Sequence, residues 1–297
     1  MSVNENGLCN GILPLVHMKS RIFGNFFVSL PFFNYGGICA DSTAIADSLW
    51  QKAVELASSK GGNYIELRSA EELPWSLPAK TSKVTMELNL PQAPEVLWKS
   101  FSSKLRSQIK RPLREGMSSK LGGIDLLDSF YAVFADNMRS LGTPVYSRSF
   151  FRAILTAFPQ SARICAVFDT LGDPVAAGFL IGFRDRIEIP WASSLRSHNH
   201  LSPNMLLYWA SLSFACEQGY KVFDFGRSTP GEGTFKFKQQ WGAQPSQLYW
   251  YYWLRDGESL PNLNPKNPKY SLAISIWKKL PLAVANWLGP IVVRNIP

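Results

Sequence analysis

The chain has 297 residues, a formal net charge of +9 and 46% hydrophobic side chains, without a low-complexity tract. This length predicts roughly one to three domains, and the composition excludes a disordered or fibrous chain. A basic balance of this size favours polyanionic partners such as nucleic acid, nucleotide phosphates or an anionic membrane face, without choosing among them.

The cysteines argue against a zinc ribbon or a disulfide framework, because all four lie far apart and form no CxxC pair. We expect reduced thiols and no metal site. The N-terminal stretch lacks the basic segment and long apolar run of a signal peptide, and no uninterrupted run of about 18 apolar residues occurs. The protein is therefore expected in the cytoplasm.

The first unit, residues 1–93, is predicted from short apolar runs, a helix and turn residues. The apolar runs Ile12 to Val16 and Asn25 to Leu30 indicate a hairpin, and a glycine-ended loop follows. Asp41 or Ser42 can cap a helix that ends at a glycine pair. Two further strands are expected before a boundary at PQAP, Tyr64 to Leu67 and Val84 to Leu90.

The second unit, residues 94–256, changes from helices to strands near Ala162. An antiparallel meander follows, then a helix with Ser202 as N-cap and Pro203 in its first position. A buried strand and a final strand from Leu248 to Leu254 complete the unit. The helices expected before the meander are Pro94 to Gly116, Asp125 to Leu141, and one beginning near Ser147.

The stretch YKVFDFGRSTPGEGTFKFKQQWG, Tyr220 to Gly242, joins an apolar strand to a glycine-broken loop. Glycines free the backbone for a tight crossing, and the cations Arg227, Lys236 and Lys238 lie close together in sequence. This combination indicates the edge of an active site that takes an anionic ligand.

The same stretch resembles the C-terminal signature of the FemAB-like acyltransferases, in the branch associated with PEP-CTERM and exosortase A. The resemblance covers nearly the whole chain. It extends through NYGG (Asn34 to Gly37), SKLRSQIKRPLREG (Ser103 to Gly116), NMRSLGTPVYSRSFF (Asn137 to Phe151) and LPNLNPKNPKY (Leu260 to Tyr270). It implies an α/β fold of two GNAT-like domains with mixed central sheets flanked by helices, the N-terminal domain being incomplete.

The resemblance also assigns catalytic residues. Lys238 matches a lysine that stabilises the reacting ester or oxyanion, and Phe237 before it matches a substrate contact; otherwise Lys238 is a solvated lysine. Arg227 can grip a carboxylate or phosphate with its fork of donors, or else pair with Asp224 or Glu232. From its place in the strand, Asp224 is expected to be a buried structural carboxylate satisfied by loop N–H groups, with general-base work as the alternative that keeps it among the catalytic candidates.

Substrate binding is assigned to residues in three places. Lys236 and Ser228 share the loop with Arg227, and Tyr35 and Gly36 form a turn that can line an acceptor cleft. The usual GNAT phosphate loop is absent: SSLRSHNHLSPN supplies Arg196, His198 and His200 at a helix N-terminus, where backbone N–H groups favour phosphate. A histidine pair in a polar loop is also often incidental.

Two further regions suggest surfaces for anions or lipids. The basic helix carries Arg106, Lys110 and Arg111, which are either a solvated face or contacts for a polyanion such as tRNA. Residues 257–297 form a Pro/Asn-rich linker and a tail that lies on a membrane or packs on the protein itself.

These observations predict an acyltransferase that moves an acyl or aminoacyl group to an amine, on a glycan or peptide acceptor of the cell envelope, in peptidoglycan or exopolysaccharide biosynthesis. Acyl-CoA or aminoacyl-tRNA is the donor, and no tightly bound cofactor is expected. Two alternatives stay open: a nonribosomal peptidyltransferase that uses aminoacyl-tRNA, and a noncatalytic binding module of the exosortase or exopolysaccharide machinery.

Overall fold

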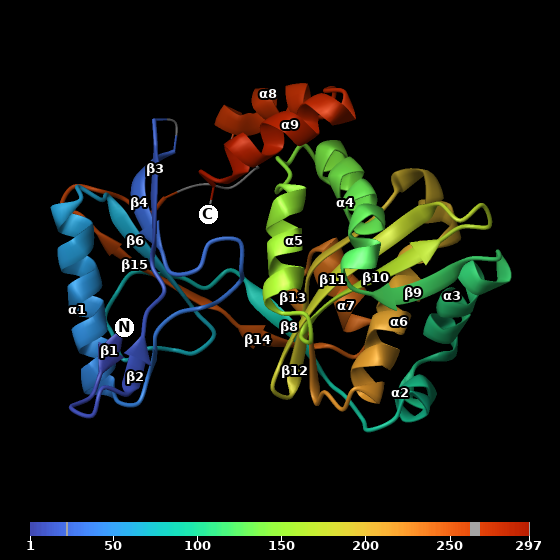
Figure 1. The fold of residues 1–297 in the computed structure, drawn as a ribbon, viewed down its shortest axis with the longest axis horizontal. Helices are drawn as coiled ribbons and strands as arrows, with labels where there is room; N and C mark the ends of the chain where they lie inside the picture. Colours follow the sequence, from blue (N-terminus) through green and yellow to red (C-terminus); the bar gives the residue numbers. More distant parts are fainter. Residues whose placement is uncertain (22, 262–267, 297) are drawn as a thin grey trace.

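A computed structural model describes residues 1–21, 23–261 and 268–296, with the side chains of 268–270 left undescribed. Within these ranges the strands form sheets of seven, five and three strands. Figure 1 shows the two larger sheets side by side. We call the five-stranded sheet, in the order β3-β4-β6-β15-β7, the N-terminal sheet, and the seven-stranded sheet, β14-β8-β13-β12-β11-β10-β9, the C-terminal sheet.

The N-terminal sheet joins segments from both ends of the chain. Its strands β3 and β4 form a hairpin, β4 runs parallel to β6, and β15 pairs with both β6 and β7. A small sheet in the order β1-β2-β5 accompanies it. The strands are β1 Ser2–Val3, β2 Cys9–Ile12, β3 Val16–Ser20, β4 Gly24–Val28, β5 Cys39–Ala40, β6 Tyr64–Ser69, β7 Ala79–Lys80 and β15 Tyr249–Leu254.

Helix α1 (Thr43–Ser59) covers the N-terminal sheet because two small residues one helical turn apart, Ala53 and Ala57, face it. They pack against Phe27 and Ile65. As expected, the side chain of Ser42 caps the helix.

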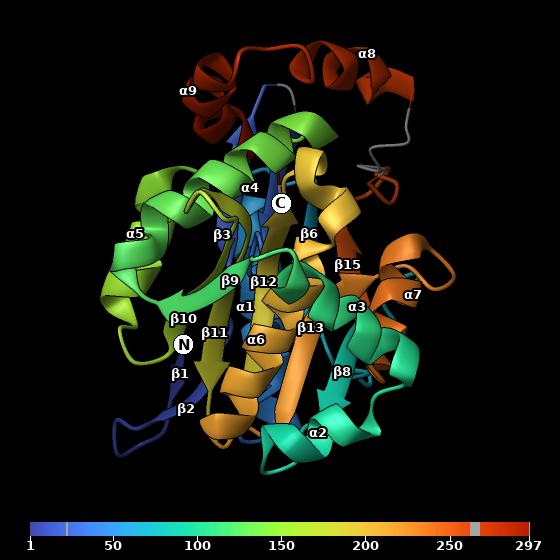
Figure 2. The same cartoon turned by 90° about the vertical axis from the view of Figure 1, so that its right-hand side faces the viewer.

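The C-terminal sheet is antiparallel except for the pair β12 and β13. One core lies between the sheet and α6, α3 and α2; the other lies under α4 and α5 (Figure 2). The strands are β8 Val84–Asn89, β9 Ser118–Gly122, β10 Ala162–Phe168, β11 Pro174–Phe183, β12 Arg186–Ser194, β13 Val222–Ser228 and β14 Gln244–Gln247. The helices are α2 Pro94–Ser100, α3 Ser103–Arg114, η1 Ile124–Leu126, α4 Leu127–Leu141, α5 Arg148–Ala157, η2 Arg196–Leu201, α6 Pro203–Glu217 and α7 Gly233–Gln239.

Two strands lie in a different sheet from the one expected. Val84–Asn89 was expected in the first unit but is hydrogen-bonded between β13 and β14 in the C-terminal sheet. Tyr249–Leu254 was expected to complete the second unit but pairs with β6 and β7 in the N-terminal sheet. The chain therefore crosses between the sheets before each proposed boundary, between β7 and β8 ahead of residue 93 and between β14 and β15 ahead of residue 256.

Several local predictions are corrected as well. The run from Ile12 to Val16 is no single strand, because β2 ends at Ile12 and β3 begins at Val16. The helix predicted from Pro94 to Gly116 is two helices, since Ser102 is extended and caps α3. Ser202 precedes α6 in a left-handed conformation, with φ 59°, and makes no side-chain cap.

The tail ends in two helices, α8 (Pro268–Trp277) and α9 (Leu282–Val293), which lie across one end of the molecule in both views (Figures 1 and 2). Residues 262–267, which hold most of the Pro/Asn-rich linker and of the motif from Leu260 to Tyr270, lie outside the described residues. In the part of the chain that the structure describes, no helix has the length and apolarity needed to cross a membrane.

Candidate active site

The candidate site lies where the parallel strands β12 and β13 separate. The two strands pair only from Arg186 to Glu188 and from Val222 to Asp224. Beyond this point β13 changes register against β8, and Gly226 adopts φ 75°, a left-handed conformation that glycine tolerates without strain. Beyond Glu188 and Asp224, the backbones of β12 and β13 no longer pair with each other, which leaves a gap between the two strands.

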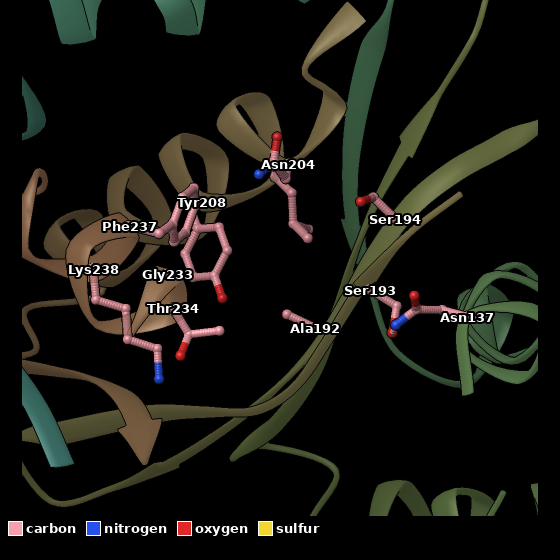
Figure 3. Close-up of a pocket in the computed structure, with 11 residues that line it drawn as sticks. Asn137, Ala192, Ser193, Ser194, Asn204, Tyr208, Gly233, Thr234, Phe237 and Lys238 are labelled. Atoms are coloured by element: carbon pink, nitrogen blue, oxygen red, sulfur yellow. Dashed lines mark hydrogen bonds between the residues drawn. The ribbon is translucent and has the colours of Figure 1, made fainter. Parts of the chain in front are cut away.

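A pocket of about 290 Å³ occupies this opening (Figure 3). Its walls come from β12, the first turns of α6, the short helix α7, and one residue of α4. The lining residues are Asn137, Ala192, Ser193, Ser194, Asn204, Leu207, Tyr208, Gly233, Thr234, Phe237 and Lys238. Both residues predicted from the motif FKFK, Phe237 and Lys238, therefore lie in the pocket wall.

Lys238 is buried, and its ammonium reaches the bend of β13. Its Nζ donates to the backbone oxygens of Gly226 at 2.8 Å and Arg227 at 2.9 Å. Because an ammonium has three hydrogens, one remains for a further acceptor. Burial lowers the pKa of Lys238 to about 8, although nearby Asp224 and Glu188 oppose the shift. The alternative of a solvated surface lysine does not describe this side chain.

Tyr208 supplies a hydroxyl beside the lysine. Its ring stacks on Phe225 at 5.5 Å and meets Phe237 edge-on at 5.0 Å, which holds it in place. Figure 3 shows the hydroxyl directed into the pocket, and among the described residues it has no hydrogen-bond partner. Burial raises the pKa of Tyr208, so the hydroxyl keeps its proton at neutral pH and can donate it.

Asp224 is a buried carboxylate whose oxygens are already occupied. Oδ1 accepts from the Thr85 hydroxyl at 2.5 Å and from the Gly226 N–H at 2.7 Å. Oδ2 accepts from the Tyr35 hydroxyl at 2.8 Å. These donors fix the bend of β13 and tie it to the loop around Tyr35, which favours a structural role.

Glu188 stands beside Asp224 on the neighbouring strand, because the two residues are paired in register. Its side chain is partly exposed, and Oε1 accepts from Asn34 Nδ2 at 3.0 Å. Burial of the carboxylate, and then the negative charge of Asp224, raise the pKa of Glu188 to about 8. Such a carboxylate can take up a proton near neutral pH, as a general base must.

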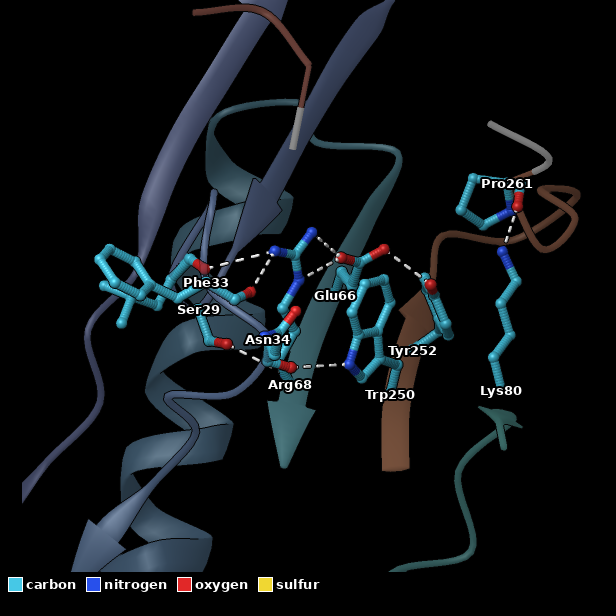
Figure 4. A network of polar contacts seen from close by, with 10 residues as sticks. Ser29, Phe33, Asn34, Glu66, Arg68, Lys80, Trp250, Tyr252 and Pro261 are labelled. Atoms are coloured by element: carbon cyan, nitrogen blue, oxygen red, sulfur yellow. Dashed lines mark hydrogen bonds and ion pairs between the residues drawn. The ribbon is translucent and has the colours of Figure 1, made fainter. Parts of the chain in front are cut away.

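The loop that carries Asn34 and Tyr35 is held by a buried ion pair (Figure 4). Arg68 Nε donates to Glu66 Oε1 at 2.8 Å, and Arg68 Nη1 donates to the Phe33 carbonyl at 2.7 Å. The backbone N–H of Gly36 donates to the Arg68 carbonyl at 3.1 Å. Gly36 thus anchors the loop, and a side chain there would collide with Leu30.

The same network supports Arg227. Trp250 Nε1 donates to the Asn34 carbonyl at 3.0 Å, and its indole ring carries the guanidinium of Arg68 at 4.3 Å and that of Arg227 at 4.8 Å. Arg227 is exposed and, among the described residues, has no carboxylate partner, so the expected alternative of an ion pair with Asp224 or Glu232 does not form there. Ser228 is buried, and its hydroxyl has no partner among the described residues.

Other predicted residues lie away from the pocket. Lys236 is exposed on α7 and does not line it. Arg196 is exposed, and His198 lies 3.8 Å from Asp169 in the β10–β11 turn. Their assignment to substrate binding stays a prediction, without support from the pocket.

Some cations of the basic helix contact the protein itself, and others face solvent. Arg106 donates to the backbone oxygens at the end of α2, with the shortest contact 2.7 Å to Phe101, and so connects α2 to α3. Lys110 lies over the ring of Trp98 at 5.8 Å. Arg111 is exposed and lines a separate surface pocket beside Arg114. Polyanion contact stays a prediction for this helix, on which Lys110 and Arg111 are both exposed.

Comparisons with known proteins agree with this architecture. The profile of a family described as an acetyltransferase (GNAT) domain matches residues 100–239. In sequence comparison, no curated protein matches the chain significantly. The resemblance to FemAB-like proteins therefore stands at the level of a GNAT-type domain and a shared fold.

Among solved structures, FemX is similar at a TM-score of 0.65 and 15% identity, covering 92% of this chain and 89% of FemX. L-PGS from Bacillus licheniformis gives 0.59 and 15%, covering 87% and 84%. The C-terminal domain of a putative lysylphosphatidylglycerol synthetase from Agrobacterium fabrum gives 0.60 and 14%, covering 84% and 83%. The expected mixed α/β fold of GNAT type is thus confirmed.

Proposed function

We propose that this protein is an acyltransferase that moves an acyl or aminoacyl group from an activated ester to an amine. The observation that carries the proposal is the electrostatic interaction of Glu188 with Lys238, which lines the pocket, near the point where β12 and β13 separate; the pKa of each group is about 8. Amide formation needs a base for the amine proton and a cation or donor for the developing oxyanion. The GNAT match over residues 100–239 supports the same reaction class.

In the proposed reaction the donor ester occupies the pocket beside Lys238 and Tyr208. The acceptor attacks as a neutral amine: its nitrogen bonds to the ester carbon, and Glu188 accepts the proton that this nitrogen loses. The remaining N–H of Lys238 stabilises the negative oxygen of the tetrahedral intermediate. When the bond to the carrier breaks, Tyr208 gives its proton to the departing sulfur or oxygen, and the proton held by Glu188 returns to Tyr208 through solvent.

The acceptor approaches from the side of Tyr35 and Arg227 in this proposal. Arg227 is exposed as a residue, but its guanidinium lies over the ring of Trp250, where desolvation and then the charge of Arg68 lower its pKa. It has no described carboxylate partner, so a phosphate or carboxylate on the acceptor can take that place. The hydroxyl of buried Ser228, which has no partner among the described residues, offers a further polar contact. We keep Asp224 as a residue that positions Gly226 and Tyr35.

Both donor classes remain in the proposal. Acyl-CoA is favoured by the match to an acetyltransferase domain. Aminoacyl-tRNA rests on the sequence resemblance to FemAB-like enzymes and on the cations of the basic helix. Work on a cell-envelope glycan or peptide, and the link to exosortase and exopolysaccharide systems, rest on the sequence resemblance. An open pocket holding a buried lysine supports an enzyme over a noncatalytic binding module.

The test supplies folded protein with labelled acyl-CoA and, in separate reactions, with aminoacyl-tRNA, against amino-sugar acceptors and peptide amines. Donor consumption that depends on the acceptor, and that Glu188→Gln and Lys238→Ala both abolish, supports the proposal. Lys236→Ala is the matched control, because this lysine lies on the same helix but is exposed. If the folded protein consumes neither donor, or if both site variants remain as active as wild type, the proposal is wrong.

A further inference from the structure

The last helix, α9, is apolar on all sides yet only half covered by protein. Its sequence LAVANWLGPIVV contains no charged residue. Ala285, Gly289 and Val293, spaced four residues apart, are buried toward the protein body. At Gly289 the helix approaches Val145 so closely that a Cβ would lie 2.8 Å from it. This stripe of small residues docks the helix.

The opposite stripe of α9 is also apolar, and it faces solvent. Trp287 is 70% exposed, Ile291 45% and Val284 38%. On α8, Leu272 is 71% exposed and Ile276, one turn later, 55%. We call these five residues the tail face. A helix that is apolar all round normally lies in a protein core or a membrane, and this pair has no core on its outer side.

The charged residues of the tail itself are all cations. Lys278 and Lys279 lie between the two helices and Arg294 follows α9, and all three are exposed. In the sequence, no aspartate or glutamate follows Glu258. A protein partner would have to complement a strongly cationic, apolar surface, whereas an anionic bilayer supplies both the charge and the apolar interior.

We propose that the tail face docks on an anionic lipid bilayer, with α8 and α9 lying in the plane of the interface. At 10 and 12 residues, the two helices are too short to span a bilayer. Trp287 lies at the centre of the exposed stripe, and tryptophan prefers the level of the lipid headgroups. The cations flank the apolar stripe, as in helices that bind membrane surfaces. This inference goes beyond the proposed reaction and does not depend on it.

The experiment measures cosedimentation of the purified full chain with phosphatidylcholine vesicles that contain zero to about 40% phosphatidylglycerol. We expect binding that rises with phosphatidylglycerol and falls with salt. The double variant Lys278→Gln/Lys279→Gln should bind anionic vesicles about fivefold more weakly for each cation removed. The double variant Trp287→Ser/Ile291→Ser should lose at least about tenfold in partitioning.

The matched control is Phe183→Ser, which removes an aromatic side chain 72% exposed at the end of β11, far along the chain from the tail. Its binding should equal that of wild type. All variants replace exposed side chains, so their thermal midpoints should stay close to wild type, and circular dichroism verifies this.

Three results would overturn the proposal. One is the absence of vesicle binding by folded wild-type protein. Another is a loss in Phe183→Ser as large as that in Trp287→Ser/Ile291→Ser. The third is a dimer, seen by light scattering without lipid, that Trp287→Ser/Ile291→Ser dissociates, because the tail face would then be an interface between copies of the chain.

Discussion

Replacing Glu188 with glutamine tests the site through stability as well as activity. The glutamine keeps the shape of the side chain and an oxygen that accepts from Asn34, but it carries no charge. In the wild type the pKa of Glu188 is about 8 against an ordinary value of 4.5. The native state therefore holds a proton that the unfolded state has released between these pH values.

The sign of the effect follows from this difference. A raised pKa favours folding fully below about 4.5, and the benefit is lost as the pH rises toward about 8. At about 1.36 kcal/mol per pH unit, the full difference amounts to ~5 kcal/mol. Because Glu188 is partly exposed and its carboxylate is coupled to Asp224, we expect ~2–4 kcal/mol instead.

The assay is urea unfolding of wild type and Glu188→Gln at pH 5 and pH 8.5, with acyl transfer measured in parallel. At pH 5 the two proteins should agree within roughly 1 kcal/mol, and at pH 8.5 the variant should be more stable by the ~2–4 kcal/mol derived above. Its kcat/KM should fall by ~10²–10⁴, the range for losing a general base. A difference in stability that does not grow with pH would refute the assignment of a raised pKa to Glu188.

Three further predictions concern neighbouring residues. In steady-state kinetics, Lys238→Ala should lower kcat by ~10²–10³, Lys238→Arg should restore only part of the loss, and Lys236→Ala should stay near wild type. Turnover of Lys238→Ala within twofold of wild type would remove the lysine from the mechanism. The profile of kcat/KM against pH should be a narrow bell centred near pH 8, because Glu188 must be ionised and Lys238 protonated. Glu188→Gln should remove the acidic limb of this bell, and a flat wild-type profile from pH 6 to 10 would contradict the assignment. Arg227→Ala should raise the KM for the acceptor by about tenfold, with little change in the KM for the donor, and the reverse pattern would move Arg227 to the donor side.

Local sequence patterns predicted most elements of this fold, but they could not assign every strand to its sheet. The meander from Ala162 to Ser194 was predictable because short turns separate its strands and neighbouring strands pair. The pairing of β8 with β13, and of β15 with β6, joins residues far apart along the chain. Alternation of apolar and polar residues identifies a strand but carries no record of its distant partner.

The candidate site was predictable where it depends on one continuous motif. Phe237 and Lys238 follow the end of the Asp224 strand, at Ser228, by nine and ten residues, so one continuous stretch contains them all. Glu188 was missed because, between Ile187 and Ile189, it has the pattern of an ordinary solvent-facing strand position. The sequence did hold a signal: the strands before and after this one are apolar runs typical of strands buried on both faces, as the structure shows them to be. A carboxylate on a strand between them has little access to water.

The role of Arg68 in anchoring the Tyr35 loop could not be predicted from the sequence either. Glu66 and Arg68 alternate with apolar residues in β6, as on a strand with one wet face. Every residue of β6 is buried, because the loop from Leu30 to Gly36 and the side chains of Trp250 and Tyr252, on the neighbouring strand β15, pack over that face. Only the tertiary arrangement converts this pair of charges into the anchor of the Tyr35 loop.

The position of β15 has consequences for how the protein is made. The strand lies between β6 and β7, so a sheet begun by the first residues synthesised is completed only when Leu254 has left the ribosome. Until then the open edge of β6 offers unpaired backbone groups to other nascent chains. No single cut of the chain leaves each of the two larger sheets whole, because β15 returns to the N-terminal sheet after the strands of the C-terminal sheet. The chain must mature as one folding unit, and premature termination before Tyr249 is expected to yield an aggregating product.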